Sequence, residues 1–391
     1  MRLPHPPDAE PLARLSPSQY QAGRLCKARL AWATRGRRDA LPDHPKALLG
    51  TSFHAVVEAA ALGRFPVNEE AIGAAAREMF DQVTGSAYVR AHELLRVKYR
   101  SADALPYYYL FRERAALAAV SVSGRRGLAS SSTVPIGGEA PPTRLIETTL
   151  TSSDGLLFGR PDYVDLQAQE IVDYKTGASS DDVTAISEAE IRQLNLYVHL
   201  ALENNLAVSR GVIVRPGGRR AVAAVAKAQA DAEGHQAREV LDQFNHAAGR
   251  RFDAIAQPST AACQFCSCIP FCESFWRDAA PAWLENCGTH VEGRITTITE
   301  SQVQGVRLLT FGLELNRGTL DAARAFVEQV PESWMTVGGS QPPAIGDILR
   351  VVHGRATSTG VASVIRVDRT ITSLWTVPQA VATPRPGVDT P

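Results

Sequence analysis

The stretch GRPDYVDLQAQEIVDYKTG, residues 159–177, predicts two strands that pair as a hairpin. Ile171 and Val172 form the apolar middle of the second strand, which ends with Asp173 and Lys175 two residues apart. Side chains at positions i and i+2 of a strand project from one face, so a carboxylate and an ammonium group leave this strand together. The hairpin would bring Asp162, eleven residues before Asp173, to the same end of the sheet.

This end of the sheet has the residue types for metal-assisted hydrolysis. Two carboxylates so close together are costly to keep ionised unless a cation lies between them. A hard divalent cation, Mg²⁺ or Mn²⁺, would be bound by their oxygens while keeping several waters. Lys175 could then orient or help deprotonate a water and offset charge on a phosphate oxygen. The arrangement favours phosphodiester hydrolysis.

The flanking sequence predicts an α/β layer. Apolar residues at three- and four-residue spacing indicate helices from residue 15 to about residue 123. The run SSSTVPIGGEAPPT, residues 130–143, predicts a loop. The remaining expected elements are strands at 144–150, 155–166, 170–175 and 211–216 and helices at 186–204 and 228–249.

The hairpin motif resembles the PD-(D/E)xK nuclease signature, and its DYKTG ending is similar to the RecB-like branch of that superfamily. Gln193 and Tyr197 match the Q-x-x-x-Y element of this branch, and their i, i+4 spacing puts both on one helical face. His54, in LGTSFHAVVE, resembles the upstream helical histidine that supplies a further metal ligand. The resemblance covers roughly residues 15–277.

The resemblance implies a restriction-endonuclease-like mixed sheet flanked by helices, over residues 15–280, with a helical insertion at about 50–127. It implies a nuclease that acts on single-stranded DNA or DNA ends, in repair, recombination or antiviral defence. Asp162, Asp173 and His54 would bind the metal, and Lys175 would support the attacking water. Gln193 and Tyr197 would position the lysine or the DNA backbone, and Arg160 would contact the nucleic acid.

Each residue also has an ordinary structural interpretation when it is considered alone. Asp173 and Lys175 could be an exposed ion pair, which contributes little stability. Asp162 could belong to a Gly-Arg-Pro turn, and His54 could be a surface or core histidine. Their joint presence in the family's order favours the nuclease. Glu147, in RLIETTL, is either a further acidic group near the site or an outward polar residue of a strand.

The cysteines form a second motif. CQFCSCIPFC contains Cys263, Cys266 and Cys272 as a C-x2-C-x5-C array, and Cys26 is the only cysteine in the first 262 residues. This layout resembles the iron-sulfur staple of AddB-type and CRISPR-associated RecB-like nucleases, which implies a structural 4Fe-4S cluster. Zinc is the alternative, because four cysteines also bind it. Cys268 could replace one of the three ligands, and Cys287 is expected to be an unliganded thiol.

Residues 288–377 predict a separate all-β domain. Five short alternating runs, at 290–300, 305–318, 346–356, 360–369 and 372–377, indicate strands, with one helix expected at 319–330. We expect a small OB-like barrel, a fold that often binds single strands. The candidate nucleic-acid contacts are the basic residues Arg307, Arg350, Arg355, Arg366 and Arg369 and the stacking residues Trp334 and Trp375. They could equally be solvated arginines and core tryptophans.

Composition limits the other possibilities. The 391 residues predict two or three domains, with a flexible segment at 1–14 and a disordered tail at 378–391. Lys plus Arg (41) equals Asp plus Glu (41), so a nucleic-acid surface would have to be local. No signal-like or membrane-spanning apolar run is seen, which favours a cytoplasmic protein without a membrane partner.

Two classes of function remain open beside the nuclease. The chain lacks a G-x-x-x-x-G-K-[ST] phosphate loop, so unwinding would require a helicase partner. The chain could instead be a non-catalytic DNA-binding or assembly module of a helicase-nuclease or defence complex. RNA also stays possible as a substrate.

Overall fold

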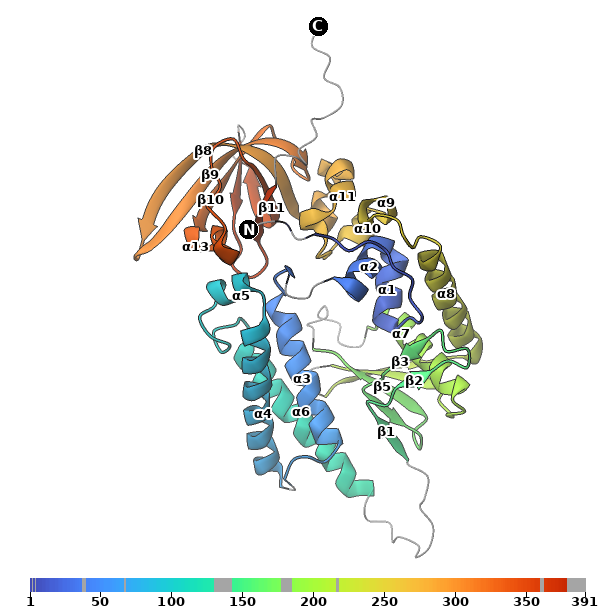
Figure 1. Cartoon of the computed structure of the whole chain (residues 1–391). Helices are drawn as coiled ribbons and strands as arrows, with labels where there is room; N and C mark the ends of the chain where they lie inside the picture. The colour runs from blue at the N-terminus through green and yellow to red at the C-terminus, as the bar shows by residue number, and fades with distance from the viewer. Residues whose placement is uncertain are drawn as a thin grey trace, which may run out of the picture.

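The computed structural model describes residues 1–377 except 2, 4, 37–39, 67, 130–142, 177–184, 216–217 and 359–361. The predicted tail at 378–391 and nearly all of the predicted loop at 130–143 lie outside the described residues. Figure 1 shows a bundle of long helices, a mixed sheet and a second sheet near the C-terminus. No described helix has the length and apolar character needed to cross a bilayer.

The central sheet has the strand order β1-β4-β5-β6-β7. Its strands are β1 Arg144–Ile146, β4 Tyr163–Asp165, β5 Glu170–Tyr174, β6 Arg210–Val214 and β7 Arg220–Ala224. The pair β5–β6 is parallel and the other pairs are antiparallel. All five residues of β5 are buried, as expected for a strand that has helices on both faces.

The first two predicted strands are each broken in two. The expected strand at 144–150 becomes β1 and β2 Leu150–Thr151, because Glu147 has a φ of 47°. The expected strand at 155–166 becomes β3 Phe158–Gly159 and β4, and Pro161, which has no N–H to donate to a ladder, lies between them. Strands β2 and β3 pair separately as a small antiparallel sheet.

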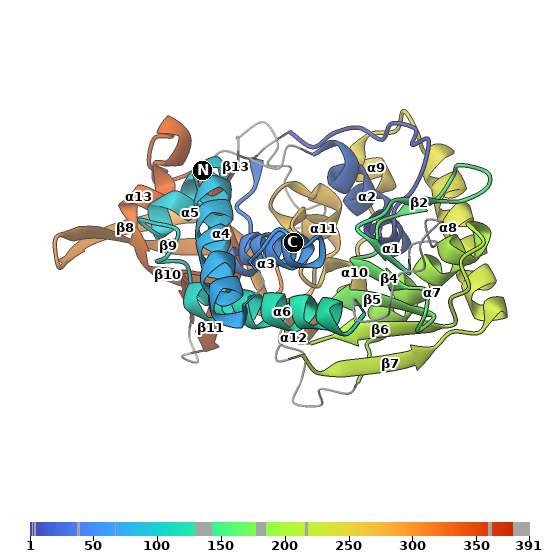
Figure 2. The same ribbon diagram turned by 90° about the horizontal axis from the view of Figure 1, so that it is seen from below.

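Helices cover both faces of the central sheet. Val172, Tyr174 and Val214 pack into a core with the long helices α3, α4 and α6. Figure 2 shows α6 running toward the side of the sheet that ends in β6 and β7. The helices of this region are α1 Pro17–Leu25, α2 Lys27–Arg35, α3 Pro45–Ala61, α4 Glu69–Arg90, α5 Glu93–Lys98, α6 Tyr108–Ala129, α7 Glu188–Glu203 and α8 Lys227–Asn245.

Helix α7 is the crossover between the parallel strands β5 and β6. It begins with a reciprocal capping box, in which Ser187 and Glu190 satisfy each other's backbone N–H groups. Gly159 lets this helix approach β3, because a Cβ there would lie 2.8 Å from Leu200 and 2.9 Å from Tyr197. The close approach places the Gln193 and Tyr197 face of α7 over the predicted site.

The cysteine-rich connection consists of short helices: α9 Phe252–Ile255, α10 Thr260–Cys263, η2 Ile269–Phe271, α11 Glu273–Asp278, η3 Pro281–Trp283 and α12 Leu284–Cys287. The described residues of segment 1–14, which the sequence predicts to be flexible, contact distant parts of the chain. Ala9 exchanges backbone hydrogen bonds with Gly249 and Arg250, and Met1 O accepts one from Thr376 N.

The C-terminal sheet has six strands in the order β12-β10-β9-β8-β11-β13, and β12 also pairs with β11. They are β8 Thr289–Val303, β9 Val306–Gly318, β10 Arg324–Pro331, β11 Ile348–Ser358, β12 Ser363–Arg366 and β13 Ser373–Val377. A two-residue turn joins β8 to β9, and both of its residues, Gln304 and Gly305, have positive φ, as type I′ hairpins require.

The helix expected at 319–330 is wrong. Residues 324–331 form β10, which pairs with β9 and β12. Ala325, Val327 and Val330 are buried in the sheet core, and a bulge between Val327 and Val330 allows both valines to face it. The helix-forming residues of this segment are therefore overridden by tertiary pairing. Two short helices follow β10, α13 Glu332–Met335 and η4 Val337–Gly339.

Candidate active site

The hairpin of β4 and β5 places the two predicted aspartates side by side. Tyr163 pairs with Val172, so Asp162, one residue before Tyr163, is level with Asp173. Asp162 Oδ2 accepts a hydrogen bond from Tyr174 N at 2.7 Å. This bond crosses the hairpin and fixes the Asp162 carboxylate against the end of β5.

Lys175, Gln193 and Tyr197 surround Asp173. Lys175 Nζ lies 2.8 Å from Asp173 Oδ2 and donates to Gln193 Oε1 at 2.8 Å. Gln193 Nε2 in turn donates to Asp173 Oδ1 at 2.9 Å. Tyr197 OH is 3.4 Å from Gln193 Nε2 and donates to the carbonyl oxygen of Arg160 at 3.3 Å. Gln193 therefore fixes the lysine and the carboxylate relative to each other.

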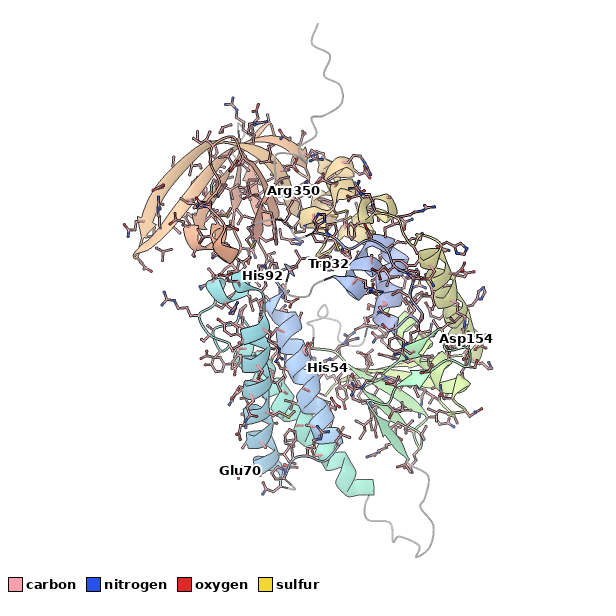
Figure 3. All side chains as sticks on the ribbon, viewed as in Figure 1. Trp32, His54, Glu70, His92, Asp154 and Arg350 are labelled. Atoms are coloured by element: carbon pink, nitrogen blue, oxygen red, sulfur yellow. The ribbon has the colours of Figure 1, made fainter. Side chains whose placement is uncertain are left out.

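His54 reaches the site from α3. Its Nδ1 lies 3.3 Å from Asp162 Oδ1, and Figure 3 places the side chain between α3 and the sheet. Burial lowers the pKa of His54, but the hydrogen bond and the charge of Asp162 outweigh it, so the pKa is raised. The structure thus brings together six of the residues that the sequence singled out: His54, Asp162, Asp173, Lys175, Gln193 and Tyr197.

Glu147 and Arg160 complete one rim of the site. Arg160 Nε lies 2.7 Å from Glu147 Oε2, and Arg160 Nη2 lies 3.0 Å from Glu58 Oε1. Burial, followed by the charge of Asp162, raises the pKa of Glu147 to about 7. Of the two interpretations of Glu147, the structure therefore favours the acidic group near the site. The sequence reasoning missed Glu58, although it stands four residues after His54, on the same helical face.

A cavity of about 290 Å³ opens beside these residues. Its polar wall includes His54, Glu58, Glu147 and Asp162, and side chains such as Val57 and Tyr163 supply apolar surface. A mostly apolar pocket with convergent polar groups and a perturbed carboxyl is the general form of an active site.

The side chains at this site are of the types that bind a hard divalent cation, although they are not gathered into a complete metal-binding arrangement. Asp162, Asp173 and His54 offer carboxylate oxygens and an imidazole nitrogen, and Lys175 and Gln193 hold the two oxygens of the buried Asp173 in place. Burial also raises the pKa of Asp173, with Lys175 opposing and Asp162 adding to the effect. Among the described residues, no three His, Cys, Asp or Glu side chains are already gathered in a metal-binding arrangement.

The cysteines meet far from this site. Cys26, Cys263, Cys266, Cys268 and Cys272 are all buried and line one cavity of about 20 Å³. A hydrogen bond with Cys268 lowers the pKa of Cys266 to about 7, whereas burial raises that of Cys263 to about 12. Cys287 does not line this cavity, and its thiol is 3.4 Å from Thr260 O.

Three of the candidate nucleic-acid contacts are buried, which favours the core interpretation of the two tryptophans. Arg350 has no exposed surface, because its guanidinium donates to Glu292, Pro270 O and Glu273. Trp334 and Trp375 are buried in the C-terminal domain, so neither offers a stacking surface. The alternation of polar and apolar residues along a strand cannot show that these side chains are buried, because the residues that cover them lie far away in the sequence.

The other predicted arginines differ in their availability. Arg307 is exposed but is held by Glu300 and Glu332. Arg355 pairs with Asp368, and Arg369 donates to Lys98 O and packs on Tyr99. Arg366 is exposed on β12, and Arg160 lies at the rim of the cavity described above.

Comparisons with known proteins bear on residues 14–273, which match the model of the PD-(D/E)XK nuclease superfamily. No curated protein matches the chain. A solved structure, described as the crystal structure of SSO0001, shares 13% sequence identity, with 43% of this chain and 79% of that chain covered. Its TM-score of 0.22 is too low to support an inference about fold or function.

Proposed function

Because the chain belongs to the PD-(D/E)XK nuclease superfamily, we propose that it is a metal-dependent DNA nuclease with Asp162, Asp173 and Lys175 at its catalytic centre. The observation that carries the proposal is the meeting of both carboxylates and the lysine at one end of the β4–β5 hairpin. Two carboxylates held close together, with burial raising the pKa of Asp173, support a cation-binding role for this cluster.

In this proposal Asp162, Asp173 and His54 hold Mg²⁺ or Mn²⁺. The metal ion supplies a more acidic water and a Lewis acid for the phosphate. Lys175 Nζ is held toward the site by Gln193 and Asp173, where it orients the attacking water and stabilises negative charge on the phosphate. Tyr197 fixes the backbone of Arg160, two residues before Asp162.

We further propose that the chain belongs to the RecB-like branch and acts as an exonuclease on single strands or DNA ends. The arrangement of Gln193 and Tyr197 around Asp173 supports this assignment. The biological setting would be repair, recombination or antiviral defence. A helicase or a defence protein would supply the unwinding activity.

The cysteine cavity would hold a structural 4Fe-4S cluster, with Cys26, Cys263, Cys266 and Cys272 as ligands. Burial of four thiols from both ends of the nuclease region in one cavity supports this proposal, and zinc remains the rival. The ultraviolet-visible spectrum and the iron and zinc content of anaerobically purified protein would decide between them. A Cys26→Ser variant should lose the bound metal and melt at a lower temperature.

For the C-terminal domain we propose an OB-like barrel. The parallel β10–β12 pair and the antiparallel β11–β12 and β8–β11 pairs support it, as does the helix α13 between β10 and β11. Its role would be to bind DNA or a partner protein. Arg366 is the remaining exposed candidate contact on β12.

The nuclease proposal is tested by incubating anaerobically purified protein with end-labelled single- and double-stranded DNA, with and without Mg²⁺ or Mn²⁺. The wild-type chain should cut only when metal is present, and a Lys175→Ala variant should not. Lys227→Ala is a matched control, because Lys227 is an exposed lysine paired with Asp231 on α8. If neither wild type nor Lys175→Ala cuts any substrate while both bind DNA, the chain is a non-catalytic binding or assembly module instead.

A further inference from the structure

A further cavity of about 240 Å³, which we call the α6 cavity, lies between α6 and the end of β6. Arg114, Leu117 and Ser121 line it from the helix, and Val214 and Arg215 line it from the strand end. Positions 114, 117 and 121 follow one another at intervals of three and four residues, so they share one face of α6. Pockets for drug-sized ligands have volumes of about 300–1,000 Å³, so this smaller cavity suits a single ring system.

The α6 cavity borders the proposed catalytic centre through two aromatic residues. Its wall includes Phe53, whose ring centroid lies 5.7 Å from that of His54, edge to face. It also includes Tyr174, which follows Asp173 at the end of β5. Tyr174 lines the 290 Å³ cavity as well, together with His54 and Asp162. The two cavities therefore share a wall, and the α6 cavity is a direct neighbour of the proposed metal site.

Most of the described wall of the α6 cavity is apolar or aromatic. Phe53, Tyr174 and Val214 belong to the buried core that α3, α4 and α6 share, so packing fixes their positions. Leu117 lines the cavity with a side chain that is 64% exposed, so the cavity is open to solvent along the helix. The cavity therefore combines a rigid aromatic wall with an apolar surface that a ligand could cover.

Arg114 is the charged group of this wall that no described acid neutralises. It is half-buried, and it makes no hydrogen bond or ion pair with any residue that the structure describes. The other arginine of the wall, Arg215, donates to both oxygens of Glu190. On α6 itself, Arg112 donates to both oxygens of Asp81. The guanidinium group of Arg114 therefore keeps its donors for a ligand of the cavity.

We propose that the α6 cavity binds the base of the nucleotide beside the cleaved phosphate and that Arg114 makes it selective for guanine. This inference rests on the proposed nuclease function. Bases stack on aromatic side chains, which Phe53 and Tyr174 supply. A guanidinium group donates two parallel hydrogen bonds to O6 and N7 of guanine, whereas the same edge of adenine offers one acceptor and one donor.

A base accounts for the cavity better than a phosphate group does. A phosphate is charged, and placing it against apolar walls without full pairing is costly. Arg114 alone would have to balance it in the described wall. A base presents apolar faces to Phe53 and Leu117 and needs hydrogen bonds only along its edge, where Arg114 and the Ser121 hydroxyl supply them.

The test is cleavage, resolved base by base, of end-labelled thymidine oligonucleotides that carry one guanine, adenine or 7-deazaguanine, with Mg²⁺ or Mn²⁺. At one fixed position relative to this base, wild type should cut the guanine strand about 5- to 150-fold faster than the adenine strand, as one bidentate contact predicts. Because 7-deazaguanine lacks the N7 acceptor, most of this preference should be lost. In Arg114→Gln the three strands should be cut at nearly equal rates. Arg77→Gln, which removes an arginine already held by Glu113, should keep the preference.

The possible failures separate this inference from the proposed function. A wild type that cuts DNA without regard to the base, or an Arg114→Gln variant that keeps the guanine preference, would overturn this inference alone. If Arg114→Gln slowed cleavage of all three strands by the same factor, the arginine would bind the phosphate backbone, which also contradicts base recognition. The 7-deazaguanine strand tests the same contact in the unaltered protein, so the result does not depend on the stability of the variant. A wild type that cuts no strand would overturn the proposed function and this inference with it.

Discussion

Two clusters of charged residues in this molecule have similar residue types but differ in how fully their charges are paired. Around Arg350, one buried acid and one half-buried acid meet two arginines: Arg350 contacts Glu292 and Glu273, and Arg317 contacts the same two. Around Asp173, Lys175 pairs with one carboxylate oxygen, while the neighbouring Asp162 carboxylate contacts the imidazole of His54 and accepts a hydrogen bond from Tyr174 N. Figure 3 places Arg350 beside α11, well away from His54 at the proposed active site.

The difference separates a structural network from a proposed site. Every charge around Arg350 has a partner, so this network holds the cysteine-rich connection against the C-terminal sheet, through Pro270 O and Glu273. The Asp173 cluster has more negative charge than its lysine can balance, which leaves it ready for a cation. A cluster whose charges are incompletely satisfied is a better indicator of function than charge density alone.

The largest effect is expected when the complete network is broken. Arg350→Met leaves Glu273 and Glu292 short of a counter-charge inside the protein, so the free energy of unfolding should fall by about 3–5 kcal/mol. Chemical denaturation would measure it. Cleavage per folded molecule should be unchanged. Arg307→Met, which removes an exposed paired arginine, should leave the free energy of unfolding nearly unchanged, and an equal loss in both variants would contradict the comparison.

A second substitution should lower the rate of cleavage without lowering stability, which is the reverse of the first. Asp173→Asn removes a proposed metal ligand, so the rate of DNA cleavage should fall by about 10²–10³-fold. The melting temperature in EDTA should rise or stay constant, because burial and the neighbouring charge of Asp162 make an ionised Asp173 costly to the fold. A lower melting temperature in Asp173→Asn would show that this carboxylate stabilises the structure, as the acids around Arg350 do.

A third prediction uses the contact between α5 and the C-terminal domain. Lys98 is buried, donates to Thr372 O at 2.6 Å and lies over the Trp334 ring. Burial lowers its pKa to about 7, with Asp368 opposing and Arg369 adding to the effect. Below pH 7 Lys98 is protonated in both the folded and the unfolded chain, and the buried charge lowers the free energy of unfolding by its full amount. Between pH 7 and 10.5 only the unfolded chain keeps it, so this cost falls as the pH rises.

The measurement is the difference in unfolding free energy between Lys98→Met and wild type across this pH range. The gain in unfolding free energy from Lys98→Met should be largest below pH 7 and should decrease by up to about 2–3 kcal/mol between pH 7 and pH 9. A difference that is constant with pH would mean that Lys98 keeps its proton in the folded chain.

The smallest effect is expected from a glycine that shapes the proposed site. Gly159→Ala should reduce stability by about 1–3 kcal/mol and slow cleavage, because the new methyl group would push Tyr197 and Leu200 away from β3. Gly85→Ala is the control, since nothing lies within 4 Å of a Cβ there and alanine favours a helix by about 0.5–1 kcal/mol. Thermal unfolding should move in opposite directions for the two variants.

The sequence was most informative where chemistry and local spacing coincide. Strand alternation was enough to pair Asp173 with Lys175, and the i, i+4 rule to pair Gln193 with Tyr197. Only the family resemblance implied that the two pairs would meet, and the family model confirms the superfamily. Order along the chain also indicated that Cys26 would meet the distant cysteines, whose shared cavity the structure shows.

The failures have a common physical cause, which is dependence on distant partners. Arg350 resembles the exposed arginines of its strand until Glu273 and Glu292 approach it. The segment 319–330 contains good helix formers, and only pairing with β9 and β12 makes it a strand.

The central claim is that Asp162 and Asp173 bind a divalent cation, and the most direct test is Mn²⁺ binding by electron paramagnetic resonance. This measurement does not depend on the choice of substrate. Wild type should bind Mn²⁺, and Asp162→Asn should weaken binding by at least about 10-fold. Asp165→Asn, an equal charge change on β4 beside Arg144, should leave binding unchanged. Equal Mn²⁺ affinity in wild type and Asp162→Asn would contradict the claim.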